Sequence, residues 1–325
     1  MKINVISDFK TSNLLNYHNK EKFKKISGLL TKYIILLSIS FIVMYPVIYM
    51  FSMTFRTTDQ VFDPTVVWIP KSFTFDNLIK TFEIGGFAEA FKNTLFFTVV
   101  CSGLTMLSCS FTGYGFARYN FKFKNILFFC VIFSIIIPPQ SIIIPTTVEM
   151  RYFDFFGFGK IPELFGGTSV TTNLLDTPLV LILSAFFANG IRAGLFIFIF
   201  RQFFLGLPKT LEEAAAIDGC GYIGTFLRII LPSSIPAFII VFIFSIISYW
   251  NDHYYTSMLF LNIQTVSKTI GTIRATLSSA GYVADEVVAI YLQAACVITI
   301  SVPLFIYIIF QRHFTESISR TGLVG

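Results

Sequence analysis

Polar side chains inside long apolar runs are the residues of this sequence that could act on a solute. Trp250, Asn251 and Asp252 stand together near the end of one such run. An indole ring can stack on the C–H face of a sugar, and amide and carboxylate oxygens accept hydrogen bonds from hydroxyl groups. The trio therefore predicts a solute contact. The alternative interpretation is an interfacial aromatic residue beside a capped helix end.

Four more polar residues interrupt apolar runs, namely Gln140, Asn189, Arg192 and Gln293. Polar groups at membrane depth are costly, so they are expected to face a cavity or another helix. Gln140 follows Pro138-Pro139, which predicts a break in its run. Backbone groups freed by proline suit a kink beside a cavity, and a plain kink without solute contact is the alternative. Arg192 either lines a solute pathway or marks the true start of its span.

The sequence offers little basis for catalysis or cofactor binding. It contains no Gly-x-x-x-x-Gly-Lys-[Ser/Thr] phosphate loop, no Gly-x-Ser-x-Gly elbow and no His-Glu-x-x-His. Three scattered His and five Cys without a Cys-x-x-Cys pair predict neither a metal site nor a disulfide framework. We therefore expect no catalytic residue, no metal and no cofactor on this chain, and no ATP site of its own.

Composition predicts an integral membrane protein. Of the 325 residues, 54% are hydrophobic and 13% are charged, whereas average soluble proteins carry about 25% charged residues. A bilayer crossing needs about 20 apolar residues as a helix. An all-α membrane protein with six transmembrane helices is therefore predicted, with apolar runs at 33–54, 94–116, 125–147, 178–204, 236–260 and 288–311.

The distribution of Lys and Arg predicts that both termini are cytoplasmic. In that orientation fifteen of them lie in inner segments and eight in outer segments, as the positive-inside rule requires. The net charge of +6 is thereby explained without a nucleic-acid partner. Lys22, Lys24 and Lys25, before the first run, are expected to contact anionic lipid. The long outer loops at 55–93 and 148–177 are expected to form folded caps.

A charged, Ala-rich segment, 211-LEEAAAIDGCGYIGTFLRIILP-232, separates the fourth and fifth runs. Thr210 and Glu213 have the spacing of a capping box, which predicts a helix from near Leu211. The three alanines favour the helix, and Asp218-Gly219 predicts its end because glycine can take a left-handed conformation there.

A second short helix is expected at 221–230, ending before Pro232, and Pro236 is expected to open the fifth span. The prediction is a helix, a glycine turn and a helix on the cytoplasmic face. Small residues at the bend would let another protein approach the backbone closely. The alternative is an ordinary capped amphipathic loop.

The spacing of this segment resembles a known signature. Glu213-Ala214-Ala215 is followed by Asp218-Gly219, then by nine residues, Ile229, one residue and Leu231-Pro232. This resembles the EAA motif of permease subunits of bacterial ABC importers. The resemblance implies a type I ABC importer permease fold, in which this segment forms cytoplasmic coupling helices that dock into a groove on an ATPase subunit. Glu213 would contact the ATPase surface and cap its helix, with capping alone as the alternative.

Within that family the chain is similar to the carbohydrate-uptake branch, especially the second permease type of maltose transporters. The similar stretches cover most of residues 40–325: 73-FTFDNLIKTF-82, 93-NTLFFTV-99, 114-YGFARYNF-121, 136-IIPPQSIIIP-145, 200-FRQFFLGLP-208, 249-YWNDHY-254 and 311-QRHFTESISRTGLVG-325. The last stretch matches the family ending G-x-x-x-G-A-V-K-G only loosely. The region 148–192 is longer than usual, which puts transfer of roles there in doubt.

The resemblance implies a permease subunit of a binding-protein-dependent importer in the bacterial cell membrane, moving a sugar or oligosaccharide by alternating access. Its implied partners are a second homologous permease, a cytoplasmic ABC ATPase dimer that uses ATP and Mg, an extracytoplasmic solute-binding protein and the lipid bilayer. The expected organisation is a basic tail (1–32), a first span with its outer loop (33–86), a permease core (87–312, coupling segment 209–232) and a C-terminal tail (313–325). Alternatives are the same machinery for a peptide, polyamine or phosphate, and a non-transporting scaffold.

Overall fold

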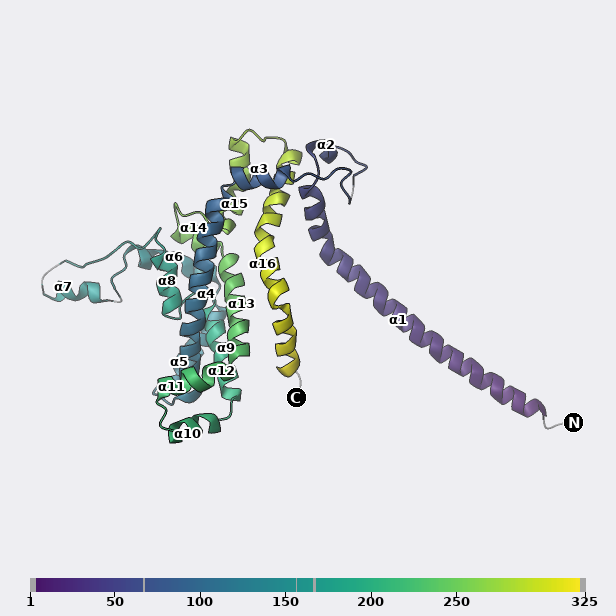
Figure 1. Ribbon diagram of the computed structural model, residues 1–325, viewed down its shortest axis with the longest axis horizontal. Helices are drawn as coiled ribbons and strands as arrows, with labels where there is room; N and C mark the ends of the chain where they lie inside the picture. Colours follow the sequence, from purple (N-terminus) through teal and green to yellow (C-terminus); the bar gives the residue numbers. More distant parts are fainter. Residues whose placement is uncertain (1–3, 67, 156, 166–167, 322–325) are drawn as a thin grey trace. The chain divides into compact units, whose positions relative to one another are not determined.

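The computed structural model describes residues 4–66, 68–155, 157–165 and 168–321. It divides into two compact units, Met1–Phe75 and Asp76–Gly325 (Figure 1). Each unit is described by itself.

The first unit consists of one long helix and a folded loop. Helix α1 (Asn4–Thr54) runs through Pro46, and the short α2 (Thr58–Val61) follows. Beyond α2 the Trp68 ring lies edge-on to Tyr45 of α1, with 5.0 Å between the ring centroids. The loop thus packs back on the helix through aromatic side chains.

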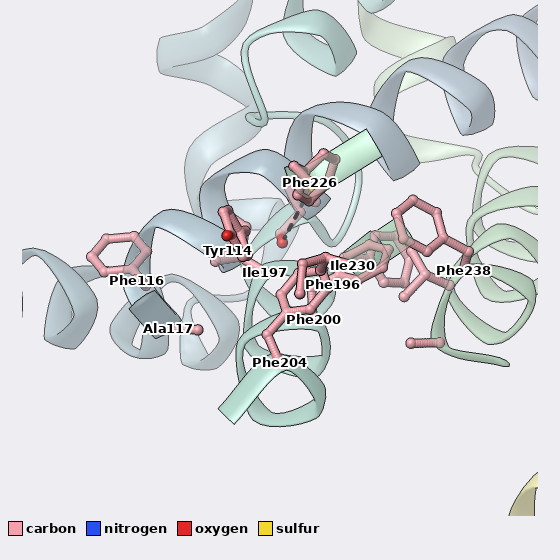
Figure 2. Packing of buried hydrophobic residues seen from close by; sticks show 14 residues of the cluster. Tyr114, Phe116, Ala117, Phe196, Ile197, Phe200, Phe204, Phe226, Ile230 and Phe238 are labelled. Carbon is pink, nitrogen blue, oxygen red and sulfur yellow. Dashed lines mark hydrogen bonds between the residues drawn. The ribbon is translucent and has the colours of Figure 1, made fainter. Parts of the chain in front are cut away.

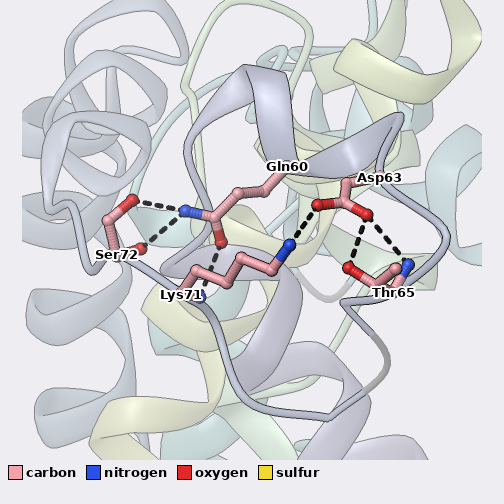
Figure 3. Close-up of polar contacts among 5 residues, drawn as sticks. All are labelled: Gln60, Asp63, Thr65, Lys71 and Ser72. Carbon is pink, nitrogen blue, oxygen red and sulfur yellow. Dashed lines mark hydrogen bonds and ion pairs between the residues drawn. The ribbon is translucent and has the colours of Figure 1, made fainter.

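Polar side chains hold the same loop together (Figure 3). The Lys71 ammonium lies 2.5 Å from Asp63 Oδ2, and Thr65 donates to Asp63 Oδ1 from both its backbone N–H and its hydroxyl. The Gln60 amide accepts from Lys71 N at 3.0 Å and donates to Ser72 O at 3.2 Å. Hydrogen bonds from Lys71 and Thr65 hold the pKa of Asp63 well below its usual range. The prediction that this loop is folded is confirmed for this stretch.

The second unit is a helical bundle. In Figure 1, α4, α13 and α16 run along its length, with α10 at one end and α3 and α15 at the other. Its principal helices are α3 (Asp76–Ile84), α4 (Phe87–Arg118), α5 (Lys124–Ile136), α6 (Pro139–Arg151), α7 (Ile161–Leu164), α8 (Leu179–Phe186), α9 (Ala193–Gly206), α10 (Thr210–Ile217), α13 (Ile235–Trp250), α14 (Tyr254–Leu259), α15 (Val266–Ser279) and α16 (Asp285–Thr321).

The close packing of α4 on α9 forms the main apolar core of this unit. Phe196, Phe200 and Phe204 of α9 are fully buried, together with Phe226 and residues of α4 and α13 (Figure 2). Gly113 brings the two backbones together, since a Cβ there would lie 2.7 Å from the Cβ of Phe200. Small residues at such contacts let membrane helices approach closely.

The helical membrane architecture agrees with the prediction, although the number of spans is counted in two ways. Within the described residues three stretches are long and apolar enough to cross a bilayer, and the number rises to six if each bent helix pair is one span. The α5–α6 pair bends by 109° at Pro138-Pro139, which confirms the predicted break. The other pairs are α9–α10, bent by 75°, and the helical stretch Tyr222–Ser233 with α13, bent by 81°.

The apolar run 178–204 is not one continuous helix, which favours the alternative that the span starts after Arg192. Helix α8 ends at Phe186, α9 begins at Ala193, and Arg192 takes a left-handed conformation with φ 59° directly before α9. Gly190 lies in the break against the Tyr249 hydroxyl and leaves no room for a side chain. This close contact stabilises an unwound stretch that the apolar pattern does not show. Arg192 is exposed and marks the start of α9.

Candidate functional site

The predicted end of the first coupling helix is confirmed. Helix α10 ends at Ile217, and Gly219 follows with φ 75°. Gly219 N donates to Ala216 O at 3.1 Å, and Cys220 N donates to Ala215 O at 2.9 Å. This pair of bonds is a Schellman motif, which satisfies the last carbonyl groups of a helix and needs a left-handed residue at its turn. Glycine takes that conformation without steric cost.

The capping box predicted at the start of this helix is not formed. Lys209 is the residue before the first turn, no side chain hydrogen-bonds to cap the helix, and Glu213 N donates to Lys209 O at 3.1 Å. Thr210 therefore lies inside the first turn, where its hydroxyl cannot act as the N-cap acceptor. The predicted capping role of Glu213 is wrong, and its side chain is exposed.

The second helical stretch is longer than predicted. It runs through α11 (Tyr222–Thr225), a wide π-type turn at Phe226–Ile230 and α12 (Leu231–Ser233), so it does not end before Pro232. Leu231 N donates to Phe226 O, five residues back. A proline ring crowds the carbonyl of the preceding turn in a regular α-helix, and the wide turn lies directly before that point. Pro236 opens α13 as predicted.

The coupling segment presents an apolar surface that the described chain leaves open. Ile217 is 86% exposed, Tyr222 78% and Ile223 72%. Ala214 and Glu213 are also exposed. Exposed apolar clusters of this kind mark contact sites for another protein more often than isolated apolar residues do. The segment therefore has the composition of a docking surface.

A buried ion pair attaches the segment to the end of α4. Arg118 Nε lies 2.7 Å from Glu212 Oε1, and Arg118 Nη2 donates to Leu207 O at 2.9 Å. The Arg118 side chain is only 5% exposed. The Tyr119 ring lies edge-on to Tyr222, with 5.8 Å between centroids, and burial raises the pKa of Tyr119, with Tyr222 and Glu212 contributing.

Sequence reasoning missed the role of this pair. In the sequence, Arg118 has no evident partner, and Glu212 stands beside the more prominent Glu213. The two partners lie 94 positions apart, and no local pattern links them. A charge at the end of an apolar run and an acid in the charged, Ala-rich segment are the only sequence signals.

The structure places the aromatic and polar trio at the C-terminal end of α13 in structural roles. The Trp250 indole is 1% exposed, and its Nε1 donates to Thr299 O of α16 at 3.1 Å. Asp252 accepts from Thr256 N at 2.9 Å at the start of α14. Asn251 is exposed, and its side chain bonds within its own helix turn. These contacts favour the capped helix end over a solute contact in this conformation.

A small cavity of about 50 Å³ brings one predicted residue together with groups that sequence reasoning missed. It is lined by Ser184, Asn189, Tyr249 and Tyr255 among others. The Tyr249 hydroxyl lies 3.0 Å from Thr105 Oγ1. Tyr249 thereby connects α13 to α4 beside the break between α8 and α9. Its only sequence signal is a polar group at membrane depth next to the more conspicuous Trp250.

The remaining predicted residues are dispersed. Gln140 and Arg192 are exposed, Gln293 is half-buried on α16, and none of them lines that cavity. Asp252 lines a separate cavity of about 10 Å³, which is too small for any solute larger than water. Of the residues predicted to contact solute, all of which the structure describes, Asn189 alone lines the larger cavity.

The described residues thus form a helical bundle with long apolar helices, bent helix pairs and an exposed helical segment at one end. The profile of the family described as "Binding-protein-dependent transport system inner membrane component" matches residues 106–320. The chain belongs to this family. It is a transport subunit and a multi-pass protein of the bacterial cell membrane.

Individual relatives match along most of the chain. The arabinooligosaccharides transport system permease protein AraQ of Halalkalibacterium halodurans is 29% identical and covers 88% of this chain and 93% of its own. The polygalacturonan/rhamnogalacturonan transport system permease protein YtcP of Bacillus subtilis is 28% identical, covering 86% and 92%. A crystal structure of a bacterial ABC transporter involved in import of the acidic polysaccharide alginate has a similar fold, with TM-score 0.69, 20% identity and coverage of 89% and 97%.

Proposed function

We propose that this chain is the permease subunit of an ATP-driven importer that moves a sugar or oligosaccharide into the cell by alternating access. Relatives with matching length are named for arabinooligosaccharides and for polygalacturonan/rhamnogalacturonan, which supports a carbohydrate over a peptide, polyamine or phosphate. The observation that carries the proposal is the exposed apolar segment at 210–223, which an ion pair with a buried arginine attaches to α4.

The orientation follows the charge distribution. Both termini lie in the cytoplasm, and six spans cross the bilayer: α1, α4, the bent α5–α6 pair, α9 with α8 before it, α13 and α16. In the other two bent pairs, α10 and the stretch Tyr222–Ser233 lie outside the bilayer. The coupling segment then faces the cytoplasm, where ATP is available. An ATPase dimer binds there, a second permease completes the pathway, and an extracytoplasmic binding protein delivers the solute.

The coupling residues have distinct tasks. Glu213 and Ala214 are exposed and contact the ATPase groove, whereas Ala215 is 2% exposed and fixes the helix on the chain's own core. Gly219 sets the bend after Asp218. Ile229, Leu231 and Pro232 carry the second stretch from the wide turn into α13. Arg118 transmits a displacement of α10 to α4, because its ion pair with Glu212 restricts movement of one helix relative to the other.

The solute pathway is formed with the second permease. Asn189 supplies a polar contact beside the break between α8 and α9, where unwound backbone also offers hydrogen-bonding groups. The other candidates (Gln140, Arg192, Trp250, Asn251, Asp252 and Gln293) would reach solute only in a rearranged or assembled state.

Substitution of the bend glycine tests docking. Placing a side chain at a left-handed position costs about 1–2 kcal/mol, and the charge of Gly219→Asp would also lie against the ATPase groove. We expect uptake and solute-stimulated ATP hydrolysis by the assembled transporter to fall at least about tenfold. Gly219→Ala and Gly221→Ala form a matched pair, because both sites have open space but only Gly219 has a positive φ.

The outcomes separate docking from substrate choice. Gly221→Ala should keep nearly full uptake, whereas Gly219→Ala should not. Full uptake and coupled ATP hydrolysis with Gly219→Asp would show that the segment does not dock the ATPase. In parallel, the transporter with its binding protein is screened for ATP hydrolysis stimulated by mono- and oligosaccharides. Stimulation by peptides with none by sugars would contradict the carbohydrate assignment.

A further inference from the structure

Several cations at the same end of the bundle as the coupling segment have no carboxylate partner among the described side chains, and Lys124, Arg201 and Lys209 are three of them. Arg118 in this region is neutralised by Glu212, whereas Lys124, Arg201 and Lys209 form no ion pair among the residues whose side chains the structure describes. Like charges brought together by the fold repel one another unless an anion is bound between them.

The fold brings Lys124 of α5 and Arg201 of α9 onto one surface, and Lys209 stands directly before α10. Lys124 and Phe128 lie four residues apart on α5 and therefore share a face. The Arg201 guanidinium carbon of α9 lies 3.9 Å from the Phe128 ring centroid, within cation–π range. Phe128 is one turn along α5 from Lys124, so its contact with Arg201 brings Arg201 near Lys124. The positive charges of Arg201 and Lys209 both repel that of Lys124.

The side chains on this surface are held in place. Lys124 Nζ donates to Tyr119 O at 2.8 Å, which keeps the ammonium at the end of α4. Arg201 Nε is buried without a hydrogen-bond partner among the described residues. Ring contact and burial fix the Arg201 guanidinium, so little side-chain entropy remains to be lost when an anion binds.

An apolar surface adjoins the cations. Phe123 is 71% exposed, Ile126 60% and Leu127 48%. These residues lie at the first turns of α5, beside Lys124. A lipid needs this arrangement, with a cationic site for its phosphate and an apolar helix face for its acyl chains.

We propose that Lys124, Arg201 and Lys209 bind the phosphate headgroup of an anionic phospholipid whose acyl chains lie along α5. The proposed orientation places this surface in the cytoplasmic leaflet. That placement rests on the proposed function, whereas the binding of the lipid does not. Basic pockets between transmembrane helices recognise such headgroups, and each basic residue near the surface contributes about 1 kcal/mol. The bound lipid neutralises the cations beside the coupling segment.

The test titrates the assembled transporter, purified in detergent, with phosphatidylglycerol and follows the midpoint of thermal unfolding. We expect phosphatidylglycerol to raise the midpoint, and phosphatidylcholine or inorganic phosphate at equal concentration not to. Arg201→Gln should raise the phosphatidylglycerol concentration needed for half the effect about fivefold, and Arg201→Gln with Lys124→Ser about 25-fold. Arg228→Gln, an exposed cation at the same end, is the matched control and should leave it unchanged.

Each other outcome overturns the site. Equal stabilisation by inorganic phosphate would identify a free anion as the ligand. An unchanged titration for Arg201→Gln would show that the lipid acts elsewhere. A phosphatidylglycerol effect that appears only in the permease pair stripped of its ATPase would assign the cations to an acidic ATPase surface. None of these results bears on sugar-stimulated ATP hydrolysis, so failure here and failure of the transport proposal are distinguishable.

Discussion

The two ends of the second unit use polar side chains in opposite ways. At the end that carries α14 and α15 they bind the chain's own backbone. Asp176 Oδ1 accepts from Asn262 N at 3.0 Å and from Ile263 N at 3.2 Å, and Lys268 Nζ donates to Leu261 O at 2.7 Å. At the coupling end one buried pair anchors the segment, and the remaining cations and apolar side chains stay open.

This difference indicates which end is complete within the chain. Loops whose polar groups are satisfied internally keep their shape without a partner. The open coupling end has a fixed attachment and an uncovered surface, which suits a site that acquires its contacts on assembly. Trp250 and Asp252 likewise hydrogen-bond to backbone groups of the chain itself, so their role here is structural.

The largest expected effect comes from breaking the anchor. Glu212→Ala leaves Arg118 buried without its carboxylate, and because Glu212 is partly exposed we expect a loss of about 2–3 kcal/mol. The midpoint of thermal unfolding of the assembled transporter measures it. Glu213→Ala is the matched neighbour. Its side chain is exposed, so stability should hold while uptake falls, and equal destabilisation by both variants would refute the anchor.

A smaller effect is expected at Trp250. Trp250→Phe removes the hydrogen bond to Thr299 O and should lower stability by about 1 kcal/mol. KM for the transported sugar should stay unchanged, because the indole faces α16. Measurement of both quantities separates the roles. A tenfold rise in KM with unchanged stability would show that Trp250 contacts the solute after all.

The smallest effect is expected at Asp176. Burial pushes the pKa of this carboxyl up, but hydrogen bonds from Asn262 and Ile263 outweigh it and hold the pKa below its ordinary value. The contribution is therefore present above about pH 4 and is lost as pH falls through the lowered pKa. Amide exchange of residues 260–263 should show this acid-dependent opening in the wild-type chain. It should be absent in Asp176→Asn, and identical pH profiles would contradict the clamp.

Features carried by short stretches of sequence could be predicted. The apolar runs, the break at Pro138-Pro139 and the glycine turn at Gly219 each follow from residues within a few positions. The Arg118–Glu212 pair could not be predicted, because tertiary packing alone brings its partners together. Arg192 predicted the break between α8 and α9 only as one of two alternatives, because the packing of the Tyr249 hydroxyl beside Gly190 has no local sequence signal.

The contact between Gly190 and Tyr249 also has a consequence for sequence variation. A Cβ at Gly190 would collide with the Tyr249 hydroxyl and lie 2.9 Å from Thr105 Oγ1, whereas Gly103 and Gly115 have open space. Alanine should therefore be tolerated at Gly103 and at Gly115. It should not be tolerated at Gly190 unless a second residue changes with it. Replacement of Gly190 would require a smaller residue in place of Tyr249 at the same time, so the two positions should vary together or not at all.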